Sequence, residues 1–146
     1  MKYTYSLDIN APIEQVFDLV EVEDKLKMWM DNLVEMVYPT PLDRRRPVGT
    51  RFIQRVREGG RIGEYEGVVT AYERPYRLTV EMGNKHFTTQ VDYQLTAIPG
   101  GTHLDYTADT LRASALARRI GKTLTGVTQK ALEKQMLKLK AAAEGS

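Results

Sequence analysis

The sequence predicts an α+β domain in which an antiparallel sheet packs against a long C-terminal helix. Three observations lead to this fold class. One alternating segment at the N-terminus precedes two short helical patterns, about six alternating segments separated by short turns come next, and a helical pattern then runs almost to the last residue. Strands joined by such short turns pair antiparallel as a meander. The apolar stripe of the last helix needs a sheet face against which it can be buried.

The N-terminal part predicts one strand and two short helices. Strict alternation over residues 3–9 is typical of a half-buried strand. Pro12 is suited to begin a helix, because a proline in the first helical turn loses no hydrogen bond. The apolar stripe of this first helix comprises Ile13, Val16, Phe17 and Val20. A second short helix is expected over residues 24–30, where it buries Leu26 and Trp29.

Six further strands are expected in the middle of the chain. The segment 39–47, with three Pro and three consecutive Arg, is a loop between the first two of them. Gly and Pro pairs supply the remaining turns, and Pro99-Gly100-Gly101 is a hairpin signal. The expected strands cover residues 33–38, 50–57, 61–72, 78–82, 86–98 and 103–109.

One long helix is expected over residues 114–144, and it carries two apolar stripes about a quarter turn apart. The first stripe consists of Leu116, Ile120, Leu124, Val127 and Ala131. The second consists of Leu132, Met136, Leu139 and Ala143. We expect the second stripe to pack on the sheet and the first to line a ligand space. A tolerated kink near Gly121 and Gly126 is the alternative explanation of the change.

Composition excludes several classes of function. The chain has no Cys and only two His, which argues against disulfides, thiolate catalysis and most metal sites, so no metal or cofactor is expected. With 21 basic and 19 acidic residues, it lacks the charge of a nucleic-acid binder. No signal peptide or membrane span is visible. We therefore expect a soluble, cytoplasmic protein, either a monomer or a homodimer, with at most transient membrane contact.

Several segments together resemble the START-like superfamily, also called SRPBCC. The stretch INAPIEQVFDLV over residues 9–20, followed by Trp29, resembles the opening of these proteins. The run GVVTAYERPYRL over 67–78, the hairpin IPGGTHL over 98–104 and the closing LEKQMLKLK are similar to later elements. The similarity is greatest to the polyketide cyclase/dehydrase-like and lipid-transport branch. It spans nearly the whole chain and implies a single domain, residues 1–146.

This resemblance implies the helix-grip fold, in which a curved antiparallel sheet of seven strands wraps around the C-terminal helix and encloses a hydrophobic pocket. Alternation assigns the pocket-facing side: Arg51, Arg55 and Arg57 cannot line an apolar cavity without partners, so the even positions of that strand face inward. The predicted ligand-binding residues are Trp29, Phe52, Gln54, Val80, Met82, Thr89, Val91, Tyr93, Tyr106, Ile120, Leu124 and Val127. A core filled by the same side chains is the alternative.

A mostly apolar pocket with a few polar groups suits a small hydrophobic or amphipathic ligand, such as a lipid, a sterol or a polyketide. Binding or transport of such a ligand is the function that we expect first. The alternative that the resemblance allows is a polyketide cyclase or aromatase, in which Gln54, Tyr93 or Tyr106 would hydrogen-bond substrate carbonyls. No His or carboxylate base is evident on the inner face, so catalytic residues remain unassigned. A chaperone-associated role is the third interpretation.

Two pairs of titratable residues are expected to be structural. His103 and Asp105 should point to solvent from the last strand, and Glu64 and Glu66 should form cross-strand ion pairs with arginines of the neighbouring strand. The arginines over residues 44–61 are interpreted as a solvated face. Their alternative role is contact with anionic lipid headgroups.

Overall fold

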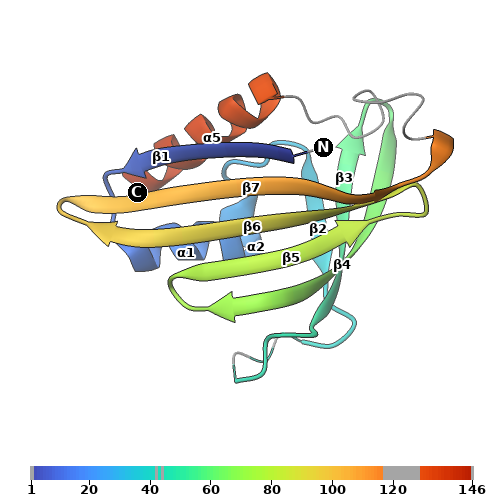
Figure 1. Ribbon diagram of the computed structural model, residues 1–146, viewed down its shortest axis with the longest axis horizontal. Helices are drawn as coiled ribbons and strands as arrows, with labels where there is room; N and C mark the ends of the chain where they lie inside the picture. The colour runs from blue at the N-terminus through green and yellow to red at the C-terminus, as the bar shows by residue number, and fades with distance from the viewer. Residues whose placement is uncertain (1, 42, 44, 117–128, 146) are drawn as a thin grey trace.

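A computed structural model describes residues 2–41, 43, 45–116 and 129–145. Within this part of the chain, seven strands form one antiparallel sheet in the order β1-β7-β6-β5-β4-β3-β2 (Figure 1). Their bounds are β1 Lys2–Ile9, β2 Leu33–Val37, β3 Arg51–Glu58, β4 Arg61–Glu73, β5 Arg77–Gly83, β6 Phe87–Ile98 and β7 Gly101–Ala113. The predicted α+β class and the antiparallel meander are confirmed, because each strand from β2 to β7 pairs with the next.

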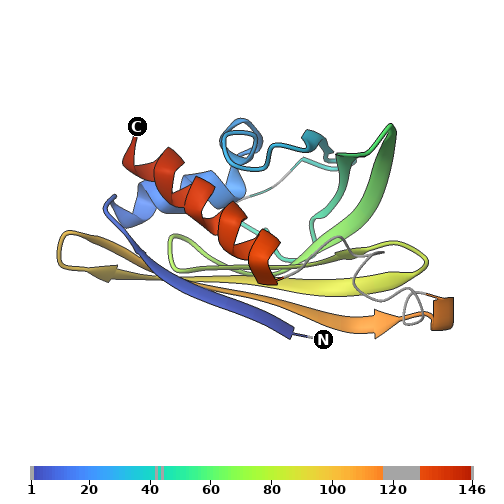
Figure 2. The same ribbon diagram turned by 90° about the horizontal axis from the view of Figure 1, so that it is seen from above.

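Three described helices lie on the same face of the sheet. These are α1 (Ile13–Glu21), α2 (Glu23–Leu26) and α5 (Gln129–Glu144). Viewed from above, the part of the sheet that contains β3 and β4 curls up beside the helices (Figure 2). The sheet is therefore concave toward the helices, as expected of neighbouring strands that are each rotated in the same hand.

The first strand lies beside the last one, a pairing that local patterns did not predict. β1 pairs antiparallel with β7 over its whole length, with Tyr5 opposite Tyr106 and Asp8 opposite His103. The N-terminal strand thereby forms one edge of the sheet, and α5 packs next to it. This pairing joins residues about a hundred positions apart in the sequence.

Two irregularities in β4 and β6 change which residues oppose one another, in addition to a register shift between Leu33 and Glu35 where β2 pairs with β3. The register between β4 and β5 shifts between Val69 and Ala71, which forms a bulge before Tyr72. A second shift lies between Thr88 and Thr89 in β6. β7 also runs to Ala113, beyond the predicted end at residue 109.

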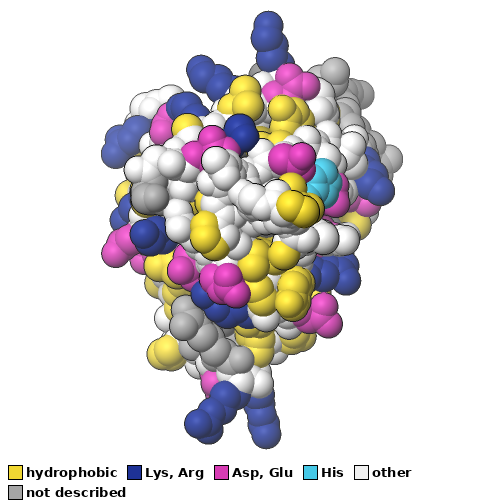
Figure 3. Space-filling view, turned by 90° about the vertical axis from the view of Figure 1, so that its left-hand side faces the viewer, with side chains coloured by type: hydrophobic (Ala, Val, Ile, Leu, Met, Phe, Trp, Pro, Cys, Tyr) yellow, Lys and Arg dark blue, Asp and Glu magenta, His cyan; other side chains and the backbone are white. Residues whose placement is uncertain are grey.

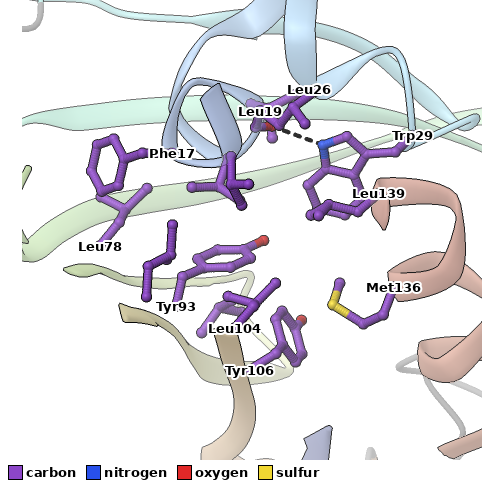
Figure 4. Packing of buried hydrophobic residues seen from close by; sticks show 14 of the residues in the cluster. Phe17, Leu19, Leu26, Trp29, Leu78, Tyr93, Leu104, Tyr106, Met136 and Leu139 are labelled. Atoms are coloured by element: carbon purple, nitrogen blue, oxygen red, sulfur yellow. Dashed lines mark hydrogen bonds between the residues drawn. The ribbon is translucent and has the colours of Figure 1, made fainter. Parts of the chain in front are cut away.

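The core lies between the concave sheet face and the helices (Figure 4). Phe17 and Trp29 are buried, as predicted. The second stripe of the C-terminal helix is also confirmed as a packing face, because its four members are the buried residues of α5: Leu132, Met136, Leu139 and Ala143. The helix expected over 114–144 is described over Gln129–Glu144. Its segment 117–128, with Ile120, Leu124 and Val127, lies outside the described residues.

The opposite face of the sheet carries ion pairs, and the one predicted for Glu64 with an arginine of the neighbouring strand is confirmed. Arg55 of β3 bonds Glu64 of β4 at 2.8 Å between Nε and Oε1, and it also pairs with Glu35 of β2. His103 lies on this face too, with its Nδ1 2.6 Å from Asp8 and its Nε2 3.2 Å from Asp105. Figure 3 shows charges of both signs interspersed over one end of the molecule, with no field of a single sign in that view.

Candidate functional site

A cavity of about 110 Å³ lies between the concave face of the sheet and the helices. An apolar cavity of about 150 Å³ can bind benzene, so this space is somewhat smaller than, but close to, the size that holds a single aromatic ring. The lining is mainly aliphatic and aromatic, and six of the seven strands contribute to it. The described lining residues are Val20, Glu21, Leu26, Met30, Met36, Tyr38, Phe52, Gln54, Val69, Tyr72, Leu78, Val80, Met82, Val91, Tyr93, Tyr106 and Gln135.

Alternation placed the sheet residues of this cavity on the correct face. The predicted residues that line it are Phe52, Gln54, Val80, Met82, Val91, Tyr93 and Tyr106. In β3 the arginines point away, because Arg55 pairs with glutamates on the outer face. Successive side chains of a strand point to opposite faces of the sheet. A strand whose alternate residues are charged therefore turns its remaining residues toward the interior.

Two of the predicted residues lie elsewhere. Trp29 is only 1% exposed, and its indole N–H donates a 2.7 Å hydrogen bond to the carbonyl of Leu19, so its polar group serves the protein fold and not the cavity. Thr89 is partly exposed near the start of β6 and does not line the cavity. The assigned face is the same as for Val91, but face alone does not indicate how far along a strand a cavity reaches.

The first apolar stripe of the C-terminal helix, which was predicted to line the ligand space, lies only in part within the described residues. Ile120, Leu124 and Val127 lie outside the described residues. Leu116, the first residue of that stripe, is 52% exposed and is not a lining residue. The described residue of α5 that does line the cavity is Gln135, which the apolar stripes did not identify.

Several polar lining residues were not predicted from the sequence, and Glu21 is the most informative of them. Glu21 follows Phe17 by four positions and therefore continues the apolar stripe of α1. A charged residue that continues an apolar stripe was the signal available in the sequence. The side chain of Glu21 is 4% exposed, which places a carboxylate beside an apolar cavity.

The carboxylate of Glu21 is bonded on both oxygens. Tyr72 Oη donates to Oε1 at 2.5 Å, and Arg74 Nη1 donates to Oε2 at 2.8 Å. Arg74 also bonds Asp18 at 2.8 Å, and its guanidinium lies 5.1 Å from the centre of the Phe17 ring. A buried carboxylate is tolerated only when it is paired and hydrogen-bonded, and this network supplies both conditions.

Tyr93 and Tyr106 form the floor of the cavity from two adjacent strands. They are opposite each other in register, and their rings meet edge to face with centroids 5.2 Å apart. Burial raises the pKa of both phenols, and for Tyr93 the nearby Tyr106 adds to the effect, so both hydroxyls stay protonated at neutral pH. Neither hydroxyl has a hydrogen-bond partner among the described residues.

The arrangement suits binding better than acid–base chemistry. Glu21 is the one carboxylate among the described lining residues, and both of its oxygens are already engaged. No group of three or more His, Asp or Glu side chains in the described ranges is placed to hold a metal ion. Among the described helices, none is long and apolar enough to cross a membrane.

Solved structures with the same fold come from several bacteria. A START superfamily protein from Mycobacterium smegmatis superposes with a TM-score of 0.75 at 16% identity, covering 99% of this chain and 97% of that one. An AHSA1-like protein from Aeromonas hydrophila gives 0.69 at 21% identity, covering 99% and 93%. A protein from Mesorhizobium loti gives 0.74 at 19% identity, covering 100% and 98%. These similarities establish the helix-grip fold.

No curated protein sequence matches this chain. The family model described as "Polyketide cyclase / dehydrase and lipid transport" matches residues 1–144. That match extends over nearly the whole length and agrees with the START-like fold of the structural neighbours. The chain therefore belongs to the polyketide cyclase/dehydrase and lipid-transport family of START-like proteins.

Proposed function

We propose that this protein binds a small hydrophobic or amphipathic ligand, of the lipid, sterol or polyketide kind, with one ring or chain of the ligand occupying the cavity between sheet and helices. The observation that carries the proposal is the composition of the lining, which is apolar except for a few side chains that can orient a ligand. The proposed ligand contacts are Phe52, Gln54, Val80, Met82, Val91, Tyr93 and Tyr106.

Family membership supports a binding role in general, and the state of Glu21 favours binding over catalysis. A cyclase needs a group that can accept a proton from its substrate. Tyr72 and Arg74 already donate to the two oxygens of Glu21, and the phenols of Tyr93 and Tyr106 are held protonated by burial. The described part of the cavity thus offers hydrogen-bond donors and apolar surface, which are what a carrier requires.

Toluene provides a direct test, because a single ring matches the size of the cavity. A ligand that binds only the folded state raises the midpoint of thermal unfolding. We expect toluene to raise it in the wild type and not in Val91→Trp, in which the indole fills the cavity. The free energy of unfolding of Val91→Trp should fall by less than about 1 kcal/mol, whereas overpacking a solid core costs about 1–3 kcal/mol.

Val68→Trp is the matched control. Val68 is a valine of the same sheet, in β4, but it does not line this cavity, whereas its neighbour Val69 does. This variant should bind toluene as the wild type does. Native mass spectrometry adds a second readout, namely an organic molecule that co-purifies with the wild type and is missing from Val91→Trp. If the wild type binds neither toluene nor any co-purifying molecule and Val91→Trp is strongly destabilised, the space is solid core and the proposal fails.

A further inference from the structure

Two hydrogen-bond donors in the cavity have no use inside the protein. Tyr93 and Tyr106 are each 7% exposed, and no described residue bonds to either hydroxyl. Every completely buried side-chain polar atom of the described residues has a hydrogen-bond partner. Since these two hydroxyls have none, they are not completely buried and are in contact with the cavity space. Figure 4 shows the two rings extending from the sheet toward the helices. Native proteins usually bond the polar groups of their interiors, so two hydroxyls that face an apolar cavity without a protein partner are donors available to a ligand.

The two donors are carried by rings that contact each other, with centroids 5.2 Å apart. Tyr93 and Tyr106 are directly opposite in the register of β6 and β7, and their rings are in edge-to-face contact. Side chains at opposite positions begin about 5 Å apart and project from the same face. Burial raises the pKa of both phenols, which keeps both as O–H donors at neutral pH. A carbonyl oxygen has two lone pairs and can accept from both.

The charges of the described lining residues disfavour an anionic ligand. No Lys, Arg or His is among the described lining residues, and the charged group that does line the cavity is the carboxylate of Glu21. The nearby Arg74 already bonds Glu21 and Asp18. A ligand carboxylate would therefore lose its hydration, find no free cation among the described lining residues and lie near the like charge of Glu21, each of which disfavours binding.

We infer that the cavity selects uncharged ligands that carry a carbonyl group, with the carbonyl oxygen accepting hydrogen bonds from Tyr93 and Tyr106, and that it rejects carboxylates of the same size. This inference rests on the proposed function and narrows its ligand class: ketone-bearing or aldehyde-bearing molecules bind, whereas ionised fatty acids do not.

Three ligands of nearly equal shape test the inference: acetophenone, α-methylstyrene, in which a methylene group replaces the carbonyl oxygen, and benzoate. Dissociation constants are measured by calorimetry at pH 7 for the wild type and for the double variant Tyr93→Phe/Tyr106→Phe. Two lost hydrogen bonds should weaken acetophenone binding roughly tenfold or more. The affinity for α-methylstyrene should be unchanged or higher. Comparing the same pair of ligands across the variants cancels their different hydration.

The carbonyl stretch of ¹³C-labelled acetophenone gives a readout that a purely structural role of the tyrosines would not move. Hydrogen bonding should shift this infrared band to lower frequency in the wild type, and the shift should disappear in the double variant. Tyr5→Phe is the matched control, because Tyr5 pairs with Tyr106 across β1 and β7 but does not line the cavity. Benzoate should bind the wild type at least about tenfold more weakly than acetophenone.

The outcomes separate the inference from the proposed function. If α-methylstyrene binds and Val91→Trp abolishes that binding, the cavity is a ligand site. Equal losses for both neutral ligands in the double variant, an unshifted carbonyl band, or benzoate binding as tight as acetophenone binding would then overturn the carbonyl selection alone. If none of the three ligands binds the wild type, the proposed function fails and the inference fails with it.

Discussion

The indole N–H of Trp29 donates a 2.7 Å hydrogen bond to the backbone carbonyl of Leu19. Leu19 lies in the last turn of α1, where carbonyl groups have no partner within the helix. Trp29 therefore closes the end of α1 and fixes this helix to the segment that follows α2. Both residues are buried, so no water can replace the bond.

Replacing Trp29 should reduce stability without removing the ligand site. We expect Trp29→Ala to lower the free energy of unfolding by about 3–5 kcal/mol, because it leaves a large void. Trp29→Phe should cost about 1–3 kcal/mol, since the Leu19 carbonyl loses its partner. Denaturant unfolding followed by circular dichroism measures both values. Toluene affinity of Trp29→Phe should stay near that of the wild type, and a selective loss of toluene binding would instead make Trp29 a ligand contact.

Removing the charge of Glu21 should destabilise the protein moderately. Breaking a buried ion pair from one side typically costs about 3–5 kcal/mol. Arg74 keeps its bond to Asp18, and its side chain is 30% exposed, so for Glu21→Gln we expect about 1–3 kcal/mol. Asp18→Asn removes the more exposed partner of the same arginine and should cost less than about 1 kcal/mol. Equal losses in urea unfolding for both variants would show that burial of Glu21 is not what makes its pair strong.

Gly67 makes room for the Phe52 ring that lines the cavity. The two residues are opposite in the register of β3 and β4, and a Cβ atom on Gly67 would overlap the ring. Gly67→Ala should therefore push the ring toward the cavity, cost about 1–3 kcal/mol of stability and weaken toluene binding. Gly60→Ala is the matched control, because a Cβ atom there would have nothing within 4 Å and the backbone at this position does not require glycine. Unchanged toluene affinity in Gly67→Ala would show that the ring can move elsewhere.

Stability should depend on pH through His103 on the outer face of the sheet. The hydrogen bond to Asp8 raises the pKa of His103, partial burial opposes the change and the charge of Asp105 adds to it. A pKa that is raised by folding stabilises the protein fully below the pKa of the unfolded chain, and the stabilisation is lost as pH rises through the folded pKa. The protonated ring should thus stabilise the fold up to about pH 6.5, with a gradual loss above it.

Nuclear magnetic resonance titration of the imidazole measures this pKa directly. In Asp8→Asn the pKa should return toward its ordinary value, and the stability lost between pH 6 and pH 8 should shrink. Both groups are more than one-third exposed on their side chains, so the effect is small and should weaken in high salt. A His103 pKa at or below the ordinary value in the wild type would contradict the prediction.

The local pattern of the sequence determined the elements and the orientation of their side chains. Side chains alternate between the two faces of a strand whatever strand lies beside it. The sequence alone therefore assigned Phe52, Val91 and Tyr106 to the inner face, where they line the cavity. Turn residues such as Gly59-Gly60 and Pro99-Gly100-Gly101 likewise act over a few positions, so the meander from β2 to β7 was predictable. The same reasoning identified the buried stripe of α5.

Tertiary structure alone decided which elements meet and where the cavity ends. β1 joins β7 through bonds between residues far apart in the sequence, which no local pattern encodes. Trp29 is a large apolar residue, and Thr89 was assigned to the inner face of its strand, so both were predicted to line the cavity. In the structure Trp29 packs against the end of α1, and Thr89 lies beyond the cavity. Glu21, Tyr72 and Arg74 come from α1, β4 and the turn after it, and they form one network only because the curved sheet brings these elements together. Contacts of this kind depend on sheet curvature and register, which arise from the sum of many pairings and not from any single segment.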